Sequence, residues 1–270
     1  MATDTHRPFI LVSNDDGYHS PGIRLLSETL SSMADLLVCA PESARSGYSC
    51  AFSADAPLRL KRRHNLGDIE VWSCNGTPVD CVKLALDQLC QGRMPDLIVS
   101  GVNHGDNSTV NTHYSGTMGV AREGAMKNIP SVAFSSCYYD EQAPLAPLVP
   151  YILRFASAVL SQGLPKGVCL NINFPAAQEF RGVRVCRMTF GRWVNEVVKA
   201  RHPRGYDYYW MVGNYANDEP EANDTDQWAL SHGYVAVTPT TVDVTAYNFI
   251  KGARELLGAV DEQTVEEDKS

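Results

Sequence analysis

The feature that most constrains the fold of this chain is a regular alternation of short apolar runs with amphipathic helical patterns. The apolar runs have the length and composition of strands buried on both faces of a parallel sheet, and they span 9–12, 35–41, 96–100, 131–135 and 168–174. Helical patterns lie between them, with starts near Ser20, Thr77, Ser115 and residue 148. A hairpin is expected between 58–60 and 69–73. Strands that alternate with helices predict an α/β fold, with a mainly parallel sheet and helices on both faces.

The pattern changes after residue 190. Segment 190–230 is rich in aromatic and polar residues and has little periodicity, which is typical of an extended excursion with a functional or interfacial role. We therefore expect a core domain over 1–189 and an extended, aromatic-rich arm over 190–230. A strand and a helix over 231–260 should complete the fold, and an acidic tail occupies 261–270.

Composition narrows the class of protein. The net charge of −8 argues against a binder of duplex nucleic acid, which would usually carry a basic face. No apolar run is long enough to span a bilayer, and the first residues lack the pattern of a secretory signal. The eight cysteines show neither a CxxC pair nor zinc spacing, so we expect a cytoplasmic protein without membrane partners. Four cysteines in strand-like segments should be buried thiols: Cys39, Cys74, Cys169 and Cys186.

Two adjacent acids, Asp15 and Asp16, follow the first apolar run. A helix entry at Ser20 and Pro21 comes shortly after them, so the acids should lie at the carboxyl end of a strand, where open α/β sheets place their ligands. Neighbouring carboxylates repel each other unless they share a cation or a proton. The pair therefore indicates a site for a hard divalent cation, although Asn-Asp-Gly is also favourable chemistry for a solvated turn.

Two later loops offer further oxygen ligands. In the loop after the second strand, the hydroxyl of Ser46 could bind a cation and Arg45 could pair with an anion, or the loop could be an exposed turn. After the strand at 96–100, Asn103 and Asn107 offer neutral carbonyl oxygens. We do not assign His104 as a ligand, because magnesium-like ions prefer oxygen.

A third loop, YSGTMG, leads into a predicted helix at Ser115. Ser115, Gly116 and Thr117 bring free backbone amides and two hydroxyls to the positive end of that helix, which is a ready phosphate site. Ordinary capping of the helix by Ser115 or Thr117 fits the same residues, and both roles can coexist.

Taken together, these stretches resemble the SurE (survival protein E) family of metal-dependent nucleotidases. The matching segments run in the family's order across most of the chain: SNDDGYHSPG (13–22), APESARSGYS (40–49), NGTPVDCV (75–82), PDLIVSGVNHGDN (95–107), YSGTMGVAREG (114–124) and GYVAVTPTTVDVT (233–245). The resemblance implies a Rossmann-like fold with a smaller C-terminal extension. It also implies hydrolysis of nucleoside 5′-monophosphates, with 3′-monophosphates as a second class, by one Mg²⁺ or Mn²⁺ per subunit.

The resemblance also carries site residues over by position. The implied metal ligands are Asp15, Asp16, Ser46 and Asn103, of which Asp15, Asp16 and Asn103 are also the implied catalytic residues. The implied phosphate or substrate contacts are Asn14, Arg45, Gly47, Asn107, Ser115, Gly116 and Thr117. Either aspartate could act as the general base. Family members form dimers and tetramers with an exchanged C-terminal extension, which implies the same for this chain.

Three other functions remain to be weighed. A haloacid-dehalogenase-like phosphatase needs two acids separated by one residue, whereas Asp15 and Asp16 are adjacent. A noncatalytic nucleotide-binding regulatory module would keep the fold without the reaction, and the intact metal and phosphate motifs argue against it. A broad-specificity phosphatase or exopolyphosphatase would use the same motifs on other substrates.

Overall fold

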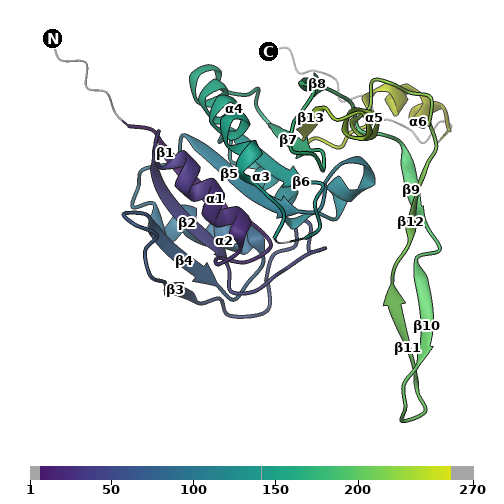
Figure 1. Cartoon of the computed structure of the whole chain (residues 1–270), viewed down its shortest axis with the longest axis horizontal. Helices are drawn as coiled ribbons and strands as arrows, with labels where there is room; N and C mark the ends of the chain where they lie inside the picture. Colours follow the sequence, from purple (N-terminus) through teal and green to yellow (C-terminus); the bar gives the residue numbers. More distant parts are fainter. Residues whose placement is uncertain (1–6, 141, 257–270) are drawn as a thin grey trace, which may run out of the picture.

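The computed structural model of the protein describes residues 7–140 and 142–256. At its centre lies a nine-stranded sheet in the order β3-β4-β2-β1-β5-β6-β7-β13-β8, with helices on both faces (Figure 1). Its strands are β1 (Phe9–Ser13), β2 (Asp35–Pro41), β3 (Leu60–Arg62), β4 (Glu70–Cys74), β5 (Leu97–His104), β6 (Ser131–Ser136), β7 (Val168–Phe174), β8 (Val183–Val185) and β13 (Val235–Thr241). The helices are α1 (Pro21–Leu30), α2 (Pro78–Leu84), α3 (Gly116–Met126), α4 (Val149–Gln162), α5 (Asp226–Ser231) and α6 (Ile250–Leu256). Shorter helical turns are η1 (Ala85–Leu89), η2 (Thr109–His113), η3 (Ala146–Leu148) and η4 (Tyr247–Phe249).

Most of the sheet is parallel. Strands β4, β2, β1, β5, β6 and β7 run in the same direction, whereas β3 is antiparallel to β4 and β13 is antiparallel to β7. The predicted fold class, a mainly parallel sheet with helices on both faces, is confirmed. The predicted hairpin is present as the pair β3 and β4. The strand predicted at 96–100 continues to His104, through an irregularity in its pairing with β6.

The helices form one layer on each face of the sheet, and each layer closes its own hydrophobic core. Helices α1 and α4 pack together on one face, where Ile10 and Val12 of β1 share an apolar cluster with Leu26 of α1. Helices α2 and α3 pack together on the other face, where Leu11 of β1 shares a second cluster with Val120 of α3. Alternate residues of β1 therefore serve opposite faces, which explains why this strand is apolar throughout.

Side-chain caps fix where the helices begin. Ser20, Thr77 and Ser115 accept hydrogen bonds from backbone amides in the first turns of α1, α2 and α3. Helix α1 also approaches the sheet closely at Gly22, where a Cβ atom would lie 1.9 Å from the carbonyl oxygen of Val102 in β5. This contact holds α1 against the irregular part of β5.

The chain order reverses between β1 and β5. From β1 the chain proceeds outward to β2 and β4, and it later returns to β5, β6 and β7 on the other side of β1. Open α/β sheets bind their ligands at the carboxyl ends of the strands where such a reversal occurs. Asp15 and Asp16 follow β1, and Asn103 lies near the end of β5, so the topology brings these residues to one place.

Residues 190–217 form an arm that projects away from the sheet (Figure 1). Its strands pair in two antiparallel ladders, β9 (Gly191–Val194) with β12 (Asn214–Asn217) and β10 (Val197–Arg201) with β11 (Asp207–Met211). The sequence has little periodicity here, and yet the segment folds into the regular paired strands of a long hairpin. Apolar and aromatic side chains are exposed along its outer part: Val197, Val198, Tyr206, Tyr209, Trp210 and Met211.

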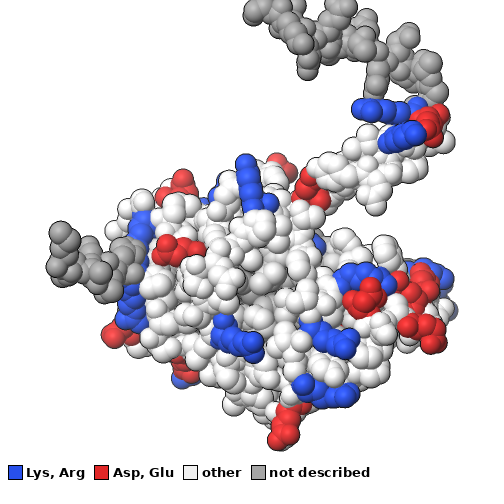
Figure 2. Space-filling model, turned by 90° about the horizontal axis from the view of Figure 1, so that it is seen from above, with Lys and Arg blue, Asp and Glu red and all other residues white. Residues whose placement is uncertain are grey.

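Charged side chains of both signs are interspersed on the face shown in Figure 2. The expected strand and helix after residue 231 are present as β13 and α6, and the acidic tail 261–270 lies outside the described residues. None of the described helices has the length and apolar character needed to cross a bilayer. The four cysteines predicted to be buried are buried and free: Cys39, Cys74, Cys169 and Cys186.

Candidate metal and phosphate site

The loop after β1 carries the two adjacent acids. Asp15 is buried, with 3% of its surface exposed, while Asp16 is partly exposed. Asn14 Nδ2 donates hydrogen bonds to the Gly17 carbonyl at 3.0 Å and to Ser20 Oγ at 2.8 Å, and its Oδ1 accepts one from Gly17 N–H at 3.2 Å. The sequence predicts a substrate contact for Asn14, but in the structure its polar atoms are used to shape this loop.

The carboxylate of Asp15 meets the first turn of α3. The hydroxyl of Thr117, a completely buried residue, donates a hydrogen bond to Asp15 Oδ1. The pKa of Asp15 is raised to about 6: burial raises it, the Thr117 hydrogen bond opposes that rise, and the neighbouring Asp16 charge adds to it. A bound cation would supply the positive charge that this pair of acids needs.

Asn103 reaches the same point from β5. Its Nδ2 donates to the Gly105 carbonyl at 2.7 Å, which leaves Oδ1 on the side of α3, 3.5 Å from Thr117 Oγ1. The pairing of β5 with β6 shifts between Ser100 and Asn103, and such bulges re-aim the side chains that follow them. Asn103 Oδ1 and Asp15 Oδ1 therefore lie against the same hydroxyl group.

Asp16 faces the residue that follows Asn103. The backbone nitrogen of His104 lies 3.4 Å from Asp16 Oδ2, and His104 Nδ1 lies 3.6 Å from the same oxygen. His104 is not expected to be a metal ligand, because magnesium-like ions prefer oxygen. The structure places it where it can orient Asp16 instead.

The amino terminus of α3 lies directly against Asp15. Ser115 is the N-cap, and its Oγ accepts a hydrogen bond from Met118 N–H at 3.0 Å. A Cβ atom on Gly116 would lie 2.8 Å from Asp15 Cβ and 3.0 Å from Asp15 Oδ2. Because Gly116 has no side chain, the positive end of the helix reaches the acid, and a phosphoryl group beside Asp15 would meet the same helix end.

The loop after β2 contacts the loop of the two acids through its backbone. The Arg45 amide donates to the Asp15 carbonyl at 2.7 Å. Arg45 Nη2 donates to the Asn75 carbonyl at 3.0 Å, and its buried Nε has no hydrogen-bond partner among the described residues. Ser46 and Gly47 are exposed. Of the four metal ligands expected from the sequence, Ser46 is the only one that is exposed.

Asn107 anchors the loop that carries the end of β5. Its Nδ2 donates to Ser135 Oγ at 2.7 Å, and its backbone N–H donates to Asn173 Oδ1 at 2.8 Å. Asn171 Nδ2 donates to the Asn107 carbonyl at 2.8 Å. The sequence predicts a substrate contact for Asn107, but the structure uses its polar groups to tie the loop to β6 and β7.

The chemistry of these side chains fits a hard divalent cation. Within residues 7–140 and 142–256, no group of three or more His, Cys, Asp and Glu side chains is arranged to hold a metal ion. A cation at this site would therefore depend on neutral oxygens beside the two acids, and Asn103 Oδ1 is one such oxygen. Carboxylate, amide and hydroxyl oxygens together suit Mg²⁺, Mn²⁺ or Ca²⁺ rather than a thiophilic metal.

Comparison with known protein families identifies the family of this chain. The family model described as "Survival protein SurE" matches residues 10–195. The chain belongs to the SurE family. The matched stretch contains β1, β5 and the start of α3, and with them all the candidate site residues.

Curated relatives and a solved structure support the same membership. The 5′-nucleotidase SurE of Phocaeicola vulgatus is 49% identical over 244 residues, which cover 90% of this chain and 95% of that protein. The 5′-nucleotidase SurE of Bacteroides thetaiotaomicron is 46% identical over 247 residues, which cover 92% of this chain and 95% of that protein. The crystal structure of SurE from Aquifex aeolicus matches with a TM-score of 0.77 and 34% identity, over 93% of this chain and 100% of that chain. The family predicted from the sequence is confirmed.

Two residues near the site of this SurE-family chain are not marked by any local sequence pattern. Asp226 is buried, and its Oδ2 accepts a hydrogen bond from the Thr109 amide at 2.8 Å, across 117 positions of the chain. Tyr139, which follows β6, donates its hydroxyl hydrogen to Asp106 Oδ2 at 3.1 Å. Contacts over such separations leave no periodic or motif signal, so only the folded structure reveals them.

The hydrogen bond between Thr117 and Asp15 determines what we expect from substitution of Thr117 in this SurE-family protein. From the sequence, Thr117 is expected to contact the phosphoryl group or to cap α3, and in the structure its hydroxyl donates a hydrogen bond to Asp15. We expect Thr117→Val to lower both metal affinity and turnover, by about 10–100-fold, because it removes the hydrogen bond that orients an expected ligand. Phosphate release measured across a Mn²⁺ titration tests this.

Thr117→Ser is the matched control, since it keeps the hydroxyl and should retain most of the activity. If Thr117→Val left the metal dependence unchanged and weakened only substrate binding, the hydroxyl would act on the phosphoryl group instead.

Proposed function

We propose that this SurE-family protein is a metal-dependent 5′-nucleotidase, which hydrolyses nucleoside 5′-monophosphates to nucleoside and inorganic phosphate. The observation that carries the proposal is the convergence of Asp15, Asn103 and Thr117 where the sheet reverses its strand order, beside the amino terminus of α3. The name 5′-nucleotidase SurE, borne by relatives at 49% and 46% identity, supports the reaction. Nucleoside 3′-monophosphates are a second substrate class for the same site.

The proposed cofactor is one Mg²⁺ or Mn²⁺ per subunit. Asp15, Asp16 and Asn103 would hold it, and Ser46 would add a hydroxyl oxygen from the neighbouring loop. When bound, the cation would supply Lewis-acid polarisation of a phosphoryl oxygen. The buried carboxylate of Asp15 lies beside that of Asp16, and this supports the assignment because adjacent carboxylates need a positive charge close to them.

Side chains and backbone amides of the protein would bind the phosphoryl group, position Asp15 and accept a proton. The backbone amides at the start of α3, with Ser115 and Gly116, would hold the phosphoryl oxygens while their charge redistributes. Thr117 would fix the position of Asp15 through its hydrogen bond. One of the two acids would accept the proton of the attacking water, and Arg45 would add positive charge from the loop after β2.

Release of inorganic phosphate from a panel of substrates tests the proposal. The panel includes nucleoside 5′- and 3′-monophosphates and polyphosphate, each with Mn²⁺, Mg²⁺ or a chelator. We expect metal-dependent release that is fastest with 5′-monophosphates. Equal rates on all substrates would favour a broad-specificity phosphatase or exopolyphosphatase. Nucleotide binding without release from any substrate would favour a noncatalytic regulatory module.

Replacing Asn103 should reduce activity without abolishing it. Asn103→Ala removes a neutral oxygen, which attracts a cation less strongly than a carboxylate does, so we expect a loss of about 10–100-fold in phosphate release. Added Mn²⁺ should recover part of the activity. Asn65→Ala, at an exposed position in the loop before β4, is the control. Unchanged metal dependence in Asn103→Ala would remove Asn103 from the ligand set.

We further propose that residues 1–189 form the catalytic core and that segment 190–230 joins subunits into a homodimer or homotetramer. The exposed apolar side chains along the arm support this, because aromatic residues are enriched at the cores of subunit interfaces. The proposed location is the cytoplasm, which suits a chain whose eight cysteines are all free.

A further inference from the structure

A cavity of about 590 Å³ lies at the same edge of the sheet as the candidate site. Its walls come from the loops that follow β5, β6 and β7, from the base of the arm and from α5. Its lining includes Asp106, Asn111, Tyr139, Trp193, Tyr215 and Gln227. Small-molecule sites usually enclose about 300–1,000 Å³, so this cavity has room for a ligand.

Two contacts join the cavity wall to the candidate site. Asn103 donates to the Gly105 carbonyl, and a Cβ atom on Gly105 would lie 2.8 Å from the ring of Tyr139, so that ring packs on the Gly105 backbone. On the other side, the Ser115 amide donates to the Asn111 carbonyl at 3.1 Å. The cavity wall is therefore linked to Asn103, an expected metal ligand, through Gly105, and to the N-cap Ser115 through Asn111.

Aromatic rings and spare hydrogen-bond donors meet in this cavity. The rings of Trp193 and Tyr215 pack edge to face with centroids 6.2 Å apart, and Trp193 Nε1 donates to Asn111 Oδ1 at 3.0 Å. Gln227 Oε1 accepts a hydrogen bond from Asn217 Nδ2 at 2.7 Å. Because their oxygens are used in this way, Asn111 and Gln227 keep amide donors for a ligand. Ring faces beside such donors suit a nucleobase, which stacks and also accepts hydrogen bonds.

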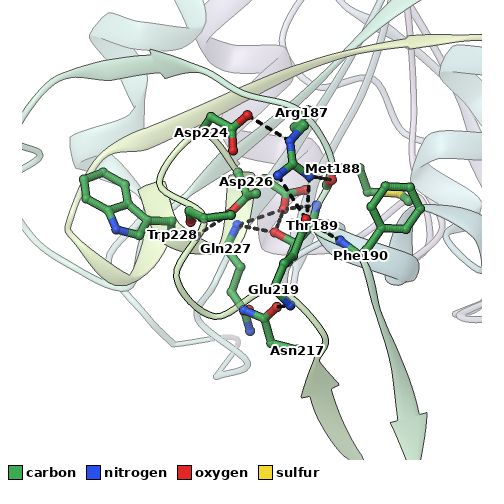
Figure 3. Close-up of polar contacts among 12 residues, drawn as sticks. Arg187, Met188, Thr189, Phe190, Asn217, Glu219, Asp224, Asp226, Gln227 and Trp228 are labelled. Carbon is green, nitrogen blue, oxygen red and sulfur yellow. Dashed lines mark hydrogen bonds and ion pairs between the residues drawn. The ribbon is translucent and has the colours of Figure 1, made fainter.

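The base of the arm is held firmly against this cavity. Arg187 binds Glu219 at 2.6 Å and Asp224 at 2.9 Å, which links the chain segments on either side of the arm (Figure 3). Asp226 Oδ1 accepts hydrogen bonds from the amide and the hydroxyl of Thr189, at 3.0 Å and 2.6 Å. The Oδ2 atom of Asp226 binds the Thr109 amide in the loop that lines the cavity. These contacts hold the aromatic wall in a fixed position relative to the candidate site.

We propose that this cavity binds the nucleoside part of the substrate, with the base of the arm forming the nucleobase wall. The inference rests on the proposed 5′-nucleotidase function and names which surface recognises the substrate. It divides the aromatic residues of segment 190–230 into two groups. Trp193 and Tyr215 serve the substrate, whereas the exposed side chains farther out on the arm serve the subunit interface.

Trp193→Ala tests the proposal with two substrates, adenosine 5′-monophosphate and ribose 5-phosphate, which lacks the base. Stacking on an aromatic side chain is worth about 1–3 kcal/mol per base, so we expect the KM for adenosine 5′-monophosphate to rise at least about fivefold. The kcat/KM for ribose 5-phosphate should stay within about twofold of the unsubstituted protein. Trp210→Ala, on the outer part of the arm, is the matched control and should change neither value.

Adenosine binding, measured by titration calorimetry, separates failure of this inference from failure of the proposed function. Binding to the unsubstituted protein and its loss in Trp193→Ala support the cavity even if no phosphate is released from any substrate. No adenosine binding by the unsubstituted protein, or an equal loss of activity on both substrates in Trp193→Ala, would overturn it. An equal loss together with a smaller assembly would mean that a second copy of the chain occupies the cavity.

Discussion

Asp15→Asn and Asp16→Asn are each expected to reduce metal-dependent phosphate release at least about 100-fold. Removal of a residue that only supports a metal ligand already lowers activity by about 10–100-fold, and these substitutions remove a charge from the proposed ligands themselves. Asn keeps the shape of the side chain, so Asp15→Asn can still exchange a hydrogen bond with Thr117. Phosphate release at saturating Mn²⁺ is the measurement.

The fold should survive both substitutions. Asp15 is buried beside a second acid, and loss of one charge removes their mutual repulsion. We therefore expect the metal-free variants to unfold at a temperature no lower than the metal-free protein, by circular dichroism. Added Mn²⁺ should raise the unfolding temperature of the unsubstituted protein more than that of either variant. Near-normal turnover in either variant would refute the proposed metal site.

Removal of the outer arm should break up the assembly while leaving the candidate site in place. Val194 and Asn214 face each other in the ladder of β9 and β12, so residues 195–213 can be replaced by Asn-Gly, which favours a tight two-residue hairpin turn. The replacement keeps Trp193, Tyr215 and the contacts at the base of the arm. Light scattering should then report a mass closer to the 29.6 kDa of one chain.

Two comparisons make the arm experiment decisive. Trp210→Ser keeps the hairpin but removes one exposed ring, so it should weaken the assembly less than the replacement does. Phosphate release per chain should change little if the arm serves assembly alone. Full-length protein that scatters as a monomer at micromolar concentration would contradict the proposed oligomer.

The sequence predicts the core well because its signals are local. Apolar runs such as 35–41 and 168–174 coincide with β2 and β7, and the caps at Ser20 and Ser115 mark where α1 and α3 begin. Adjacent acids after a buried strand also have few structural uses, which is why Asp15 and Asp16 stand out. Local patterns of this kind survive folding because burial and capping act on neighbouring residues.

The details of the site depend on contacts that no local pattern encodes. The direction of the Thr117 hydroxyl depends on how α3 packs against the end of β1, and the position of Asn103 depends on a shift in strand pairing. The arm is less predictable still, because its strands are stabilised by pairing with each other rather than by a buried face. Asp226 is the clearest case, since it joins segments that are far apart in the chain.

The close approach of two helices to their neighbours limits how the protein could be engineered for heat resistance. Exchanging glycine for alanine within helices is a common way to raise stability, by about 1 kcal/mol per site. In α1, the methyl group of Gly22→Ala would lie 1.9 Å from a carbonyl oxygen, and in α3 that of Gly116→Ala would press on Asp15. Neither glycine at the helix starts that flank the proposed reaction site can therefore be replaced by alanine without a clash. A variant with a higher unfolding temperature would need stabilising substitutions on surfaces away from that edge of the sheet.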